Sequence, residues 1–256
     1  MPEINTYKII ELSKNHFQEI KKLKQKKNRR NDQKTLVEGL NLLEQMLDNG
    51  IFPLEIITGK PELSGSVFKG TKCPVYLAKH HEIMQLAETE TPQSVVAVFN
   101  IPDFKLLQYK FILYLDGIQD PGNLGTIFRT AAAFKIEGVV LSPDCCEVFS
   151  PKVIRASLGS VFWIPSITED DEWLANQKAE VIGLTVSGAT TLNNLKLNRD
   201  KPLIVVIGSE GNGISKEISA LLTDTASIPI STKMESLNAA VAAGIALYEI
   251  TGRFSY

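Results

Sequence analysis

The sequence predicts an α/β protein with two domains, in which a mostly parallel sheet with helices on both faces forms the C-terminal domain. Three observations predict this fold. Apolar strand-like runs alternate with amphipathic helical segments over residues 107–256. A smaller set of α and β segments precedes them. Between the two sets, NIPDFKLLQY at 100–109 has the proline and the polarity of a domain boundary. We therefore expect domains at residues 1–106 and 107–256.

The composition is that of a folded protein. The 256 residues are 44% hydrophobic with a formal net charge of -2, which supplies a core and excludes a uniformly basic nucleic-acid binder. The three cysteines have neither a disulfide pattern nor metal-ligand spacing, and we interpret His16, His80 and His81 as surface residues. No basic-then-apolar leader opens the chain, and no apolar run is long enough to cross a bilayer. We expect a cytoplasmic protein without a membrane segment or a metal site.

Residues 14–34 are strongly basic, with nine Lys or Arg against two acidic residues. Phe17, Ile20 and Leu23 recur at helical spacing, so one face of the predicted helix can pack. The basic residues expected to project outward are Lys21, Lys22, Lys24, Lys26 and Lys27, with Arg29 and Arg30 in the turn that follows. A solvated helix face and a surface for a polyanion both fit this pattern.

The rest of the N-terminal domain reads as a short α/β arrangement. An extended piece at 35–39 leads into a helix with apolar residues on one side, which ends at Gly50. Short buried strands are expected at LEIITG, CPVYLA and SVVAVF, which occupy 54–59, 73–78 and 94–99.

Strands and helices alternate in the C-terminal domain. Strands are expected at 111–116, 138–142, 162–167, 180–186, 203–208 and 226–230. Helices are expected at 122–134, 151–159, 171–177, 215–223 and 236–250. Because ligands of parallel sheets bind at the carboxyl ends of the strands, the loops that follow the strands are the candidate sites.

The first candidate loop is DPGNLGTIFR, 120–129. Gly122 and Gly125 allow a tight turn before a helix N-terminus, which favours anions. The loop lacks the GKS or GKT ending of a P-loop and does not fit GxGxxG, so it is not a nucleotide loop of those kinds. A simple turn and cap remains an alternative. Arg129, less than two turns into an apolar helix, must pair or reach the surface.

The second candidate loop is VVIGSEGNGIS, 205–215. A buried strand ends at Gly208, and Glu210 stands beside glycines that leave space around it. A carboxylate in such a loop can cap backbone amides or order the loop, and both uses are structural.

The third candidate loop is IPISTKMESLN, 228–238. Pro229 stops ladder pairing at the strand end, so the polar residues after it must form a loop. Ser236 is the expected N-cap of the last helix, with Asn238 in its first turn. Taken singly, each of the three loops is a weak functional signal.

Together, the three loops agree in order and spacing with the motifs of one family. NLGTIFR has the form NxGxxxR, IGSEGNGIS the form GxExxG, and IPISTKMESLN the form IPMxGxxxSLN with Thr232 in place of the glycine. The sequence resembles the SpoU/TrmH branch of the SPOUT RNA methyltransferases over nearly all of residues 107–256. SPKVIRASLGSVF, 150–162, is similar to the substrate-facing segment of that family. The N-terminal part is similar to its substrate-binding domain, a small fold like a ribosomal protein.

The resemblance implies a trefoil-knotted sheet that holds S-adenosylmethionine in the knot. By similarity, Gly208, Ile228 and Leu237 line the cofactor pocket, with the strand end at 185–188 nearby. Thr232 leaves the position of the knot loop, and with it the affinity for the cofactor, open. The final helix is expected to pack within the chain or to form a homodimer, as family members do.

The resemblance also implies methyl transfer to a ribose 2′-hydroxyl. By similarity, the residues around the reaction are Asn123, Arg129, Glu210, Ser236 and Asn238. Arg129 has been proposed as the general base in this family, but an arginine side chain stays protonated. We expect Arg129 to hold the adjacent phosphate and the developing alkoxide, with Glu210 and Asn238 orienting it.

RNA is the implied substrate. The expected RNA contacts are Lys22, Lys26, Arg29, Arg30, Lys152 and Arg155. We favour ribosomal RNA, because a separate N-terminal domain resembles the ribosomal RNA members more than the compact transfer RNA members. A transfer RNA substrate and a non-catalytic RNA-binding protein remain alternatives. A nucleotide-binding oxidoreductase does not fit, because GxGxxG is missing after the first strand.

Overall fold

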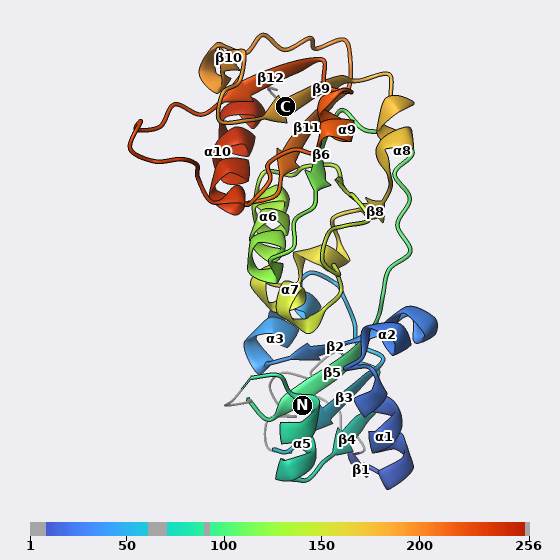
Figure 1. The fold of residues 1–256 in the computed structure, drawn as a ribbon. Coiled ribbons are helices and arrows are strands. Elements are labelled where there is room, and N and C mark those ends of the chain that lie inside the picture. The colour runs from blue at the N-terminus through green and yellow to red at the C-terminus, as the bar shows by residue number, and fades with distance from the viewer. Residues whose placement is uncertain (1–8, 61–70, 90–92, 254–256) are drawn as a thin grey trace, which may run out of the picture. The chain divides into compact units, whose positions relative to one another are not determined.

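A computed structural model describes residues 9–60, 71–89 and 93–253 (Figure 1). The chain forms two compact units, one of residues 1–102 with 149–162 and one of residues 103–148 with 163–256. The segment 149–162 therefore packs with the N-terminal unit, although the sequence places it between strands of the C-terminal sheet. The hydroxyl of Thr35 donates to the carbonyl of Phe149 at 2.8 Å and ties this segment to strand β2.

The N-terminal unit contains a five-stranded mixed sheet of order β1-β4-β3-β5-β2. β3 runs parallel to β4 and antiparallel to β5, and β1 is an edge strand that the sequence did not predict. The strands are β1 Ile9–Glu11, β2 Lys34–Glu38, β3 Glu55–Thr58, β4 Val75–Leu77 and β5 Val95–Asn100. The other four strands confirm the predicted extended piece and the three buried runs.

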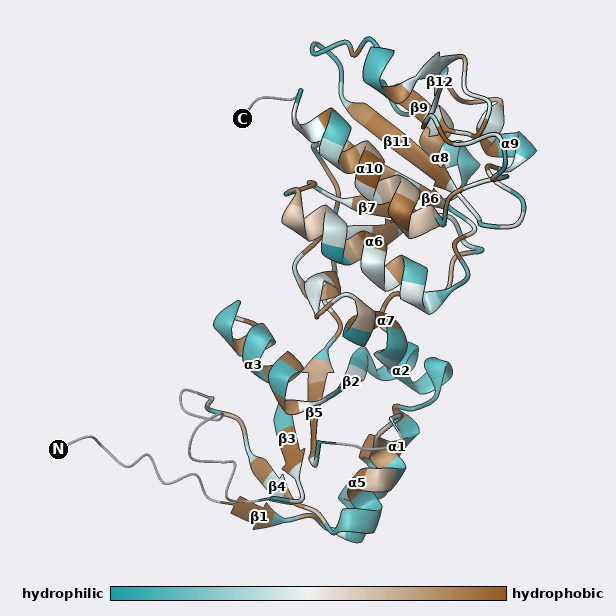
Figure 2. Ribbon diagram, turned by 90° about the vertical axis from the view of Figure 1, so that its left-hand side faces the viewer, coloured by the Kyte–Doolittle hydropathy of each residue, from teal (hydrophilic) through white to brown (hydrophobic). Residues whose placement is uncertain are grey.

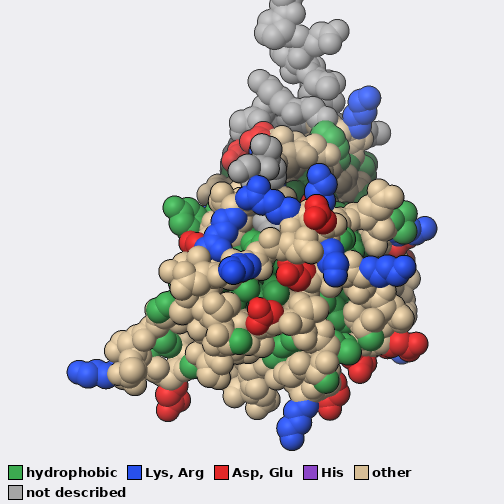
Figure 3. Space-filling model, turned by 90° about the horizontal axis from the view of Figure 1, so that it is seen from above, with side chains coloured by type: hydrophobic (Ala, Val, Ile, Leu, Met, Phe, Trp, Pro, Cys, Tyr) green, Lys and Arg blue, Asp and Glu red, His purple; other side chains and the backbone are tan. Residues whose placement is uncertain are grey.

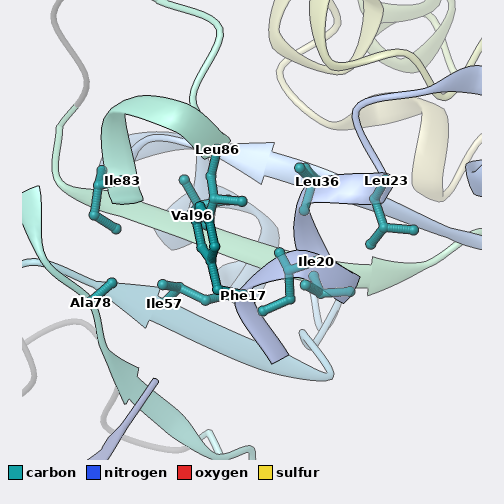
Figure 4. Packing of buried hydrophobic residues seen from close by; sticks show 10 residues of the cluster. Phe17, Ile20, Leu23, Leu36, Ile57, Ala78, Ile83, Leu86 and Val96 are labelled. Atoms are coloured by element: carbon teal, nitrogen blue, oxygen red, sulfur yellow. The ribbon is translucent and has the colours of Figure 1, made fainter. Parts of the chain in front are cut away.

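Short helices cover this sheet. They are α1 Lys14–Lys22, α2 Lys26–Asp32, α3 Leu40–Asp48 and α5 His80–Leu86, joined by α7 Pro151–Ala156 and the 3₁₀ turn η2 Ser160–Phe162. Phe17, Ile20 and Leu23 are buried against residues of the sheet and of α5 (Figure 4). The predicted packing face of the basic helix is thus confirmed, because its three apolar residues enter the core of the unit.

Arg29 differs from the sequence prediction. It lies inside α2 rather than in a turn, and it is only 5% exposed. Its Nη1 donates to the carbonyl oxygens of Leu23 and Lys24 at 2.9 and 2.7 Å. Because the last carbonyls of a helix lack partners within the helix, the guanidinium serves the end of α1 and is not presented to a polyanion.

His16 also departs from its expected place on the open surface. It is half-buried, and its Nε2 lies 2.6 Å from the Glu55 carboxylate, while its ring packs against Tyr76 with centroids 4.8 Å apart. The other two histidines, His80 and His81, are exposed as expected. The local sequence around His16 does not indicate that Glu55, on a strand far along the chain, lies next to it.

The C-terminal unit contains a seven-stranded sheet of order β10-β12-β9-β11-β6-β7-β8, in which every pairing is parallel. The strands are β6 Phe111–Asp116, β7 Val139–Leu141, β8 Ser166–Thr168, β9 Glu180–Leu184, β10 Thr190–Thr191, β11 Leu203–Gly208 and β12 Asp224–Ser227. Apolar residues run along the whole of β11 (Figure 2). This pattern fits a strand that is buried on both faces, and it confirms the predicted parallel sheet.

Helices lie on both faces of the parallel sheet. α6 Pro121–Ala133 packs against α10 Ala239–Thr251 on one side, and α8 Asp171–Ala175 and α9 Lys216–Ser219 lie on the other (Figure 1). Alternate strand residues such as Tyr114 and Val206 share a buried cluster with Leu174 and Ile218 of α8 and α9. The carboxyl ends of β6, β9 and β11 are thereby held at one edge of a rigid sheet.

The beginning of α10 corrects the predicted cap. Asn238, not Ser236, is the N-cap, and its Oδ1 accepts from the backbone N–H groups of Ala240 and Val241 at 3.0 and 3.2 Å. Ser236 is exposed and lies two residues before the cap. Both residue types are favoured at N-caps, so which of them caps the helix depends on the residue at which the preceding loop ends and α10 begins.

Candidate functional site

A cavity of about 410 Å³ lies in the C-terminal unit where β9, β11 and β12 end. The residues that line it are Leu184, Thr185, Val186, Ile207, Gly208, Ser209, Glu210, Gly211, Asn212, Gly213, Ile214, Ile228, Ile230, Glu235, Ser236, Leu237, Ala239 and Ala242. The three expected cofactor residues, Gly208, Ile228 and Leu237, are among them. The volume lies in the range of small-molecule sites, so the second and third candidate loops enclose one pocket.

Gly208 has a steric requirement that the sequence did not reveal. A Cβ atom at this position would collide with the backbone of Gly213 and Ile214. The loop folds back on itself here, because Ser209 and Gly213 exchange backbone hydrogen bonds of 3.0 and 2.9 Å, with Gly213 at φ +67°. Glycine is therefore needed for close approach of two backbone segments, and the resulting hairpin presents Glu210 at the edge of the cavity.

A hydrogen-bonded chain of side chains joins the three candidate loops. Asn238 Nδ2 donates to Asn123 Oδ1 at 2.9 Å, and Asn123 Nδ2 donates to the carboxylate of Glu210. Asn123 belongs to the first turn of α6, where its backbone N–H is capped by Asp120 at 2.8 Å. Residues far apart in the sequence thus meet beside the cavity, as the predicted site requires.

The groups at the two ends of this side-chain network, the N–H groups of α10 and the Glu210 carboxylate, fix the orientation of both amides. The Oδ1 of Asn238 is used by the N-terminal N–H groups of α10, so only its Nδ2 can face Asn123. Asn123 must then present its oxygen to Asn238 and its nitrogen to Glu210, whose carboxylate can only accept. The arrangement leaves no freedom to flip either amide, so Glu210 is held in a defined place.

Arg129 lies on the exposed side of α6. Within residues 9–60, 71–89 and 93–253, its guanidinium makes no hydrogen bond or ion pair. It is not among the residues that line the cavity. Of the two alternatives that the sequence allowed, pairing or reaching the surface, the structure has the second, which leaves the guanidinium available to an anion. The expected orientation of Arg129 by Glu210 and Asn238 is not found among the described residues, because both side chains hydrogen-bond to Asn123 instead.

The third loop adopts an ordinary turn around Thr232. Met234 N donates to Ser231 O at 3.0 Å, and Lys233 N donates to the Ser231 hydroxyl at 3.3 Å. Thr232 is exposed, does not line the cavity and is absent from the residues with positive φ. A threonine is therefore accepted here without the backbone conformation that would call for glycine.

Cys145 and Cys146 stand next to the site and are structural in character. Cys145 Sγ accepts from the backbone N–H of Ile118 at 3.3 Å, and burial raises the pKa of its thiol. For Cys146, burial first, and then the nearby Cys145, Asp120 and Glu210, raise the pKa to about 11. Both thiols are therefore protonated near neutral pH and are poor nucleophiles.

Five of the six expected RNA contacts are exposed, and Arg29 is the exception. The exposed residues are Lys22, Lys26, Arg30, Lys152 and Arg155. All five belong to the compact unit that contains α1, α2 and α7. Figure 3 shows a different face, seen from above relative to Figure 1, where Lys and Arg side chains are mixed with Asp and Glu side chains and the charge is not uniformly positive.

The described residues contain neither a metal-binding cluster nor a membrane-spanning helix. Across the described residues, no cluster of three or more His, Cys, Asp or Glu side chains could hold a metal ion. No helix in the same residues is long and apolar enough to span a membrane.

The sequence motifs do not single out every residue of the cavity. Thr185 and Val186 line it at the strand end that was expected to lie nearby, whereas Ile230 and Ala242, in the third loop and α10, were not named individually. Glu235 adds a second carboxylate. The sequence motifs identify the loops, but they define only some positions in each loop. The positions between them give no indication of which side chains face the cavity. The polar string of the third loop could have directed attention to Glu235.

The family models that match the chain cover both of its parts. Residues 110–248 match the model described as the SpoU rRNA Methylase family, and residues 14–97 match the model described as an MRM3-like substrate binding domain.

Relatives match over nearly the whole chain. It is 32% identical over 251 residues to the 23S rRNA (guanosine(2553)-2'-O)-methyltransferase RlmP of Bacillus subtilis, with 96% of this chain and 100% of the relative covered. A structure from Porphyromonas gingivalis, provisionally described as a TrmH-family RNA methyltransferase, matches at 32% identity and TM-score 0.82, covering 94% and 99%. The AdoMet-bound rRNA methyltransferase of Sinorhizobium meliloti matches at 27% identity and TM-score 0.81, covering 97% and 98%.

Proposed function

This chain belongs to the SpoU rRNA methylase family, and we propose that it transfers a methyl group from S-adenosylmethionine to a ribose 2′-hydroxyl of ribosomal RNA. The observation that carries the proposal is the side-chain network from Asn238 through Asn123 to Glu210 beside the cavity. The network unites the three sequence motifs at one point. The name of the Bacillus subtilis relative, which matches along its full length, supports ribosomal RNA over transfer RNA.

The cavity fits the methyl donor in size and charge. Its lining offers apolar side chains such as Ile228 and Leu237 for an adenosyl group, together with backbone groups around Gly208. Its charged residues are the carboxylates Glu210 and Glu235, with no Lys, Arg or His among the described residues that line it. The donor supplies an electrophilic methyl group on a positively charged sulfonium, and negative charge around the pocket favours such a ligand.

The described residues around Glu210 would position the acceptor ribose. Methyl transfer needs the hydroxyl oxygen in line with the methyl carbon, so positioning contributes much of the rate. Arg129 would hold the phosphate next to the reacting ribose and stabilise the developing alkoxide, while Ser236 on the cavity wall would contact the ribose. Since arginine stays protonated, the proton of the hydroxyl would leave through water and not to Arg129.

The N-terminal unit would bind the RNA. Exposed Lys22, Lys26 and Arg30 on α1 and α2, and Lys152 and Arg155 on α7, would contact phosphates. Such contacts give affinity that falls with salt but carry no sequence information. Recognition would then depend on the folded shape of the RNA. We propose a substrate-binding domain at residues 1–106 and a methyltransferase domain at residues 107–256, whose segment 149–162, with Lys152 and Arg155, packs with the N-terminal unit.

Several further features follow from the family as proposals. We infer a trefoil knot in which the chain near the second and third motifs passes through a loop, and an N-terminal fold like that of a ribosomal protein. A homodimer through α10 is supported by Val241, Ile245 and Tyr248, which are 52, 38 and 70% exposed. Because their spacing puts them on one side of the helix, they would form an apolar contact surface. We also propose that the protein is located in the cytoplasm.

The test is methyl transfer from labelled S-adenosylmethionine to ribosomal RNA and transfer RNA from a strain that lacks the gene. We expect label at one ribosomal 2′-hydroxyl, lost in Arg129→Ala and retained in Lys196→Ala, which removes one exposed positive charge elsewhere in the same unit. Label in transfer RNA alone would overturn the ribosomal substrate. Cofactor binding without any label would contradict catalysis on these RNAs and favour a non-catalytic RNA-binding role. Near full turnover of Arg129→Lys would refute bidentate positioning by Arg129.

A further inference from the structure

A second cavity, of about 840 Å³, lies within the N-terminal unit between α1 and α5. Its floor is apolar: Phe17 and Ala78 are buried, and Leu12 and Leu77 are partly buried. Phe17 and Ala78 also belong to the buried core cluster of this unit (Figure 4). The basic residues proposed above as phosphate contacts do not line this cavity, so it has no assigned role.

The rim of this second cavity is polar and exposed. It carries Lys14 and Gln18 from α1 and Lys79, His80 and His81 from the start of α5. In the part of the chain that the structure describes, the side chains of Lys14, His80 and His81 make no hydrogen bond or ion pair. Cationic, amide and imidazole groups thus surround an apolar floor and are not engaged with the protein.

Lysines and carboxylates are equal in number around the rim, but they are not equally free. Two carboxylates, Glu11 and Glu82, also line the cavity, but Glu82 accepts a hydrogen bond from the backbone N–H of Lys79 at 2.8 Å. On the far side, Lys21 Nζ donates to the Gln85 side chain at 2.6 Å and Lys24 Nζ to its carbonyl at 3.1 Å. Two lysines, Lys14 and Lys79, therefore line the cavity with two carboxylates, one of which is already used as a helix cap, and Lys21 and Lys24 are not part of the lining.

We propose that this cavity binds an unpaired nucleotide of the RNA substrate. Unpaired RNA bases are recognised by stacking on aromatic, histidine or arginine side chains and by hydrogen bonds to their edges. Here the base lies on the Phe17 and Ala78 floor against His80 or His81, Gln18 meets its polar edge, and Lys14 and Lys79 bind the flanking phosphates. The match of residues 14–97 to a substrate binding domain supports RNA as the ligand. The inference rests on the proposed function.

The shape of the site favours an unpaired nucleotide over a duplex. Proteins contact paired RNA mainly through phosphates and 2′-hydroxyls on the outside of the helix, because its bases are stacked inside. A concave site with an apolar floor offers such a helix no partner, whereas a base turned out of its stack fills it. The cavity would therefore make binding specific for RNA loops or bulges, which phosphate contacts from lysines alone cannot do.

Photo-crosslinking identifies the contact directly. Ribosomal RNA that carries 4-thiouridine is mixed with the full-length protein, irradiated and digested, and the cross-linked peptides are identified by mass spectrometry. We expect cross-links in the peptides that contain Phe17 or His80, joined to nucleotides that are unpaired in the RNA. If RNA binds but no cross-link falls in residues 11–18 or 77–85, or if the linked nucleotides are paired, the proposal is overturned.

Binding measurements with matched variants separate this site from general attraction to RNA. His80→Ala combined with His81→Ala should weaken binding about tenfold, as expected for loss of stacking. Lys14→Gln should lower the slope of log affinity against log salt by about 0.7, one phosphate contact. Lys34→Gln removes an equal charge from β2, at the opposite edge of the sheet from β1. If Lys14→Gln and Lys34→Gln gave the same slope, the proposal would be wrong.

The same samples distinguish failure of this inference from failure of the proposed function. Binding of S-adenosylmethionine involves the other unit, so the variants should keep the affinity of the wild type for it. A wild-type protein that methylates RNA while the His80 and His81 double variant binds RNA normally would overturn the nucleotide site and leave the enzyme intact. A wild-type protein that neither binds the donor nor methylates RNA would overturn the proposed function itself.

Discussion

Asn123→Asp tests whether the network across the three loops supports methyl transfer. The substitution keeps the size of the side chain but removes the Nδ2 donor used by Glu210 and adds a negative charge beside that carboxylate. Asn238 can still donate to the new side chain. The change therefore breaks only the connection between the first and second motifs.

The size of the effect follows from exposure. A hydrogen bond to a charged group contributes about 1.5–3 kcal/mol where it is well protected. Asn123 is half-buried and Glu210 is exposed, so we take about 1 kcal/mol after solvent screening. Two carboxylates about 4 Å apart in water add roughly 1 kcal/mol of repulsion. A total of about 2 kcal/mol corresponds to roughly a thirtyfold decrease in the equilibrium constant for assembling the three loops.

The assay is kcat/KM for methyl transfer to ribosomal RNA, with donor affinity measured by calorimetry. We expect kcat/KM to fall about thirtyfold. Asn193→Asp is the matched control, because it makes the same chemical change at an exposed residue outside the cavity, and it should stay within about twofold of wild type. If Asn123→Asp retained more than a third of wild-type kcat/KM, the network would not hold the site together.

Four further predictions concern the cavity and its surroundings. Gly208→Ala should cost about 2 kcal/mol and lower Tm by about 4–8 °C, whereas Gly211→Ala, whose Cβ meets open space, should leave Tm unchanged in calorimetry. Glu235→Gln should weaken binding of S-adenosylmethionine about threefold and leave binding of S-adenosylhomocysteine, which lacks the sulfonium charge, unaffected. Thr232→Gly should change donor Kd by less than about threefold, because Thr232 has no strained backbone. Alkylation of Cys146, followed by peptide mass spectrometry, should rise about tenfold per pH unit from pH 8 to 10, because its pKa is raised to about 11.

The C-terminal sheet was predictable because its local signals agree with the final structure. Apolar runs such as 203–208 became central strands, and the residues of the second and third loops came together in one cavity. The position of the last helix cap was not predictable, because Ser236 and Asn238 are both good caps. Only the tertiary contact with Asn123 distinguishes them.

The N-terminal unit shows a different limit. Helical spacing correctly predicted the buried side of α1, but charge alone suggested that Arg29 would be free for RNA. The structure instead uses it to satisfy carbonyls at the end of α1. The packing of 149–162 with this unit was also beyond reach, because it depends on Thr35 and Gly159 meeting residues distant in sequence. Composition gives the number of cationic side chains in a segment, but it does not show which of them form hydrogen bonds with backbone carbonyls.

The identity of residue 238 shows how helix capping and the side-chain network together restrict one position. Its side chain must accept from two backbone N–H groups and also donate to Asn123. Aspartate could cap the helix but has no donor, and serine or threonine would need one oxygen atom for both tasks. Asparagine separates the tasks onto two atoms, so the helix end that holds the oxygen also aims the nitrogen. The rigidity of α10 is thereby transmitted through Asn123 to Glu210, and the third motif can order a carboxylate that it does not itself contain.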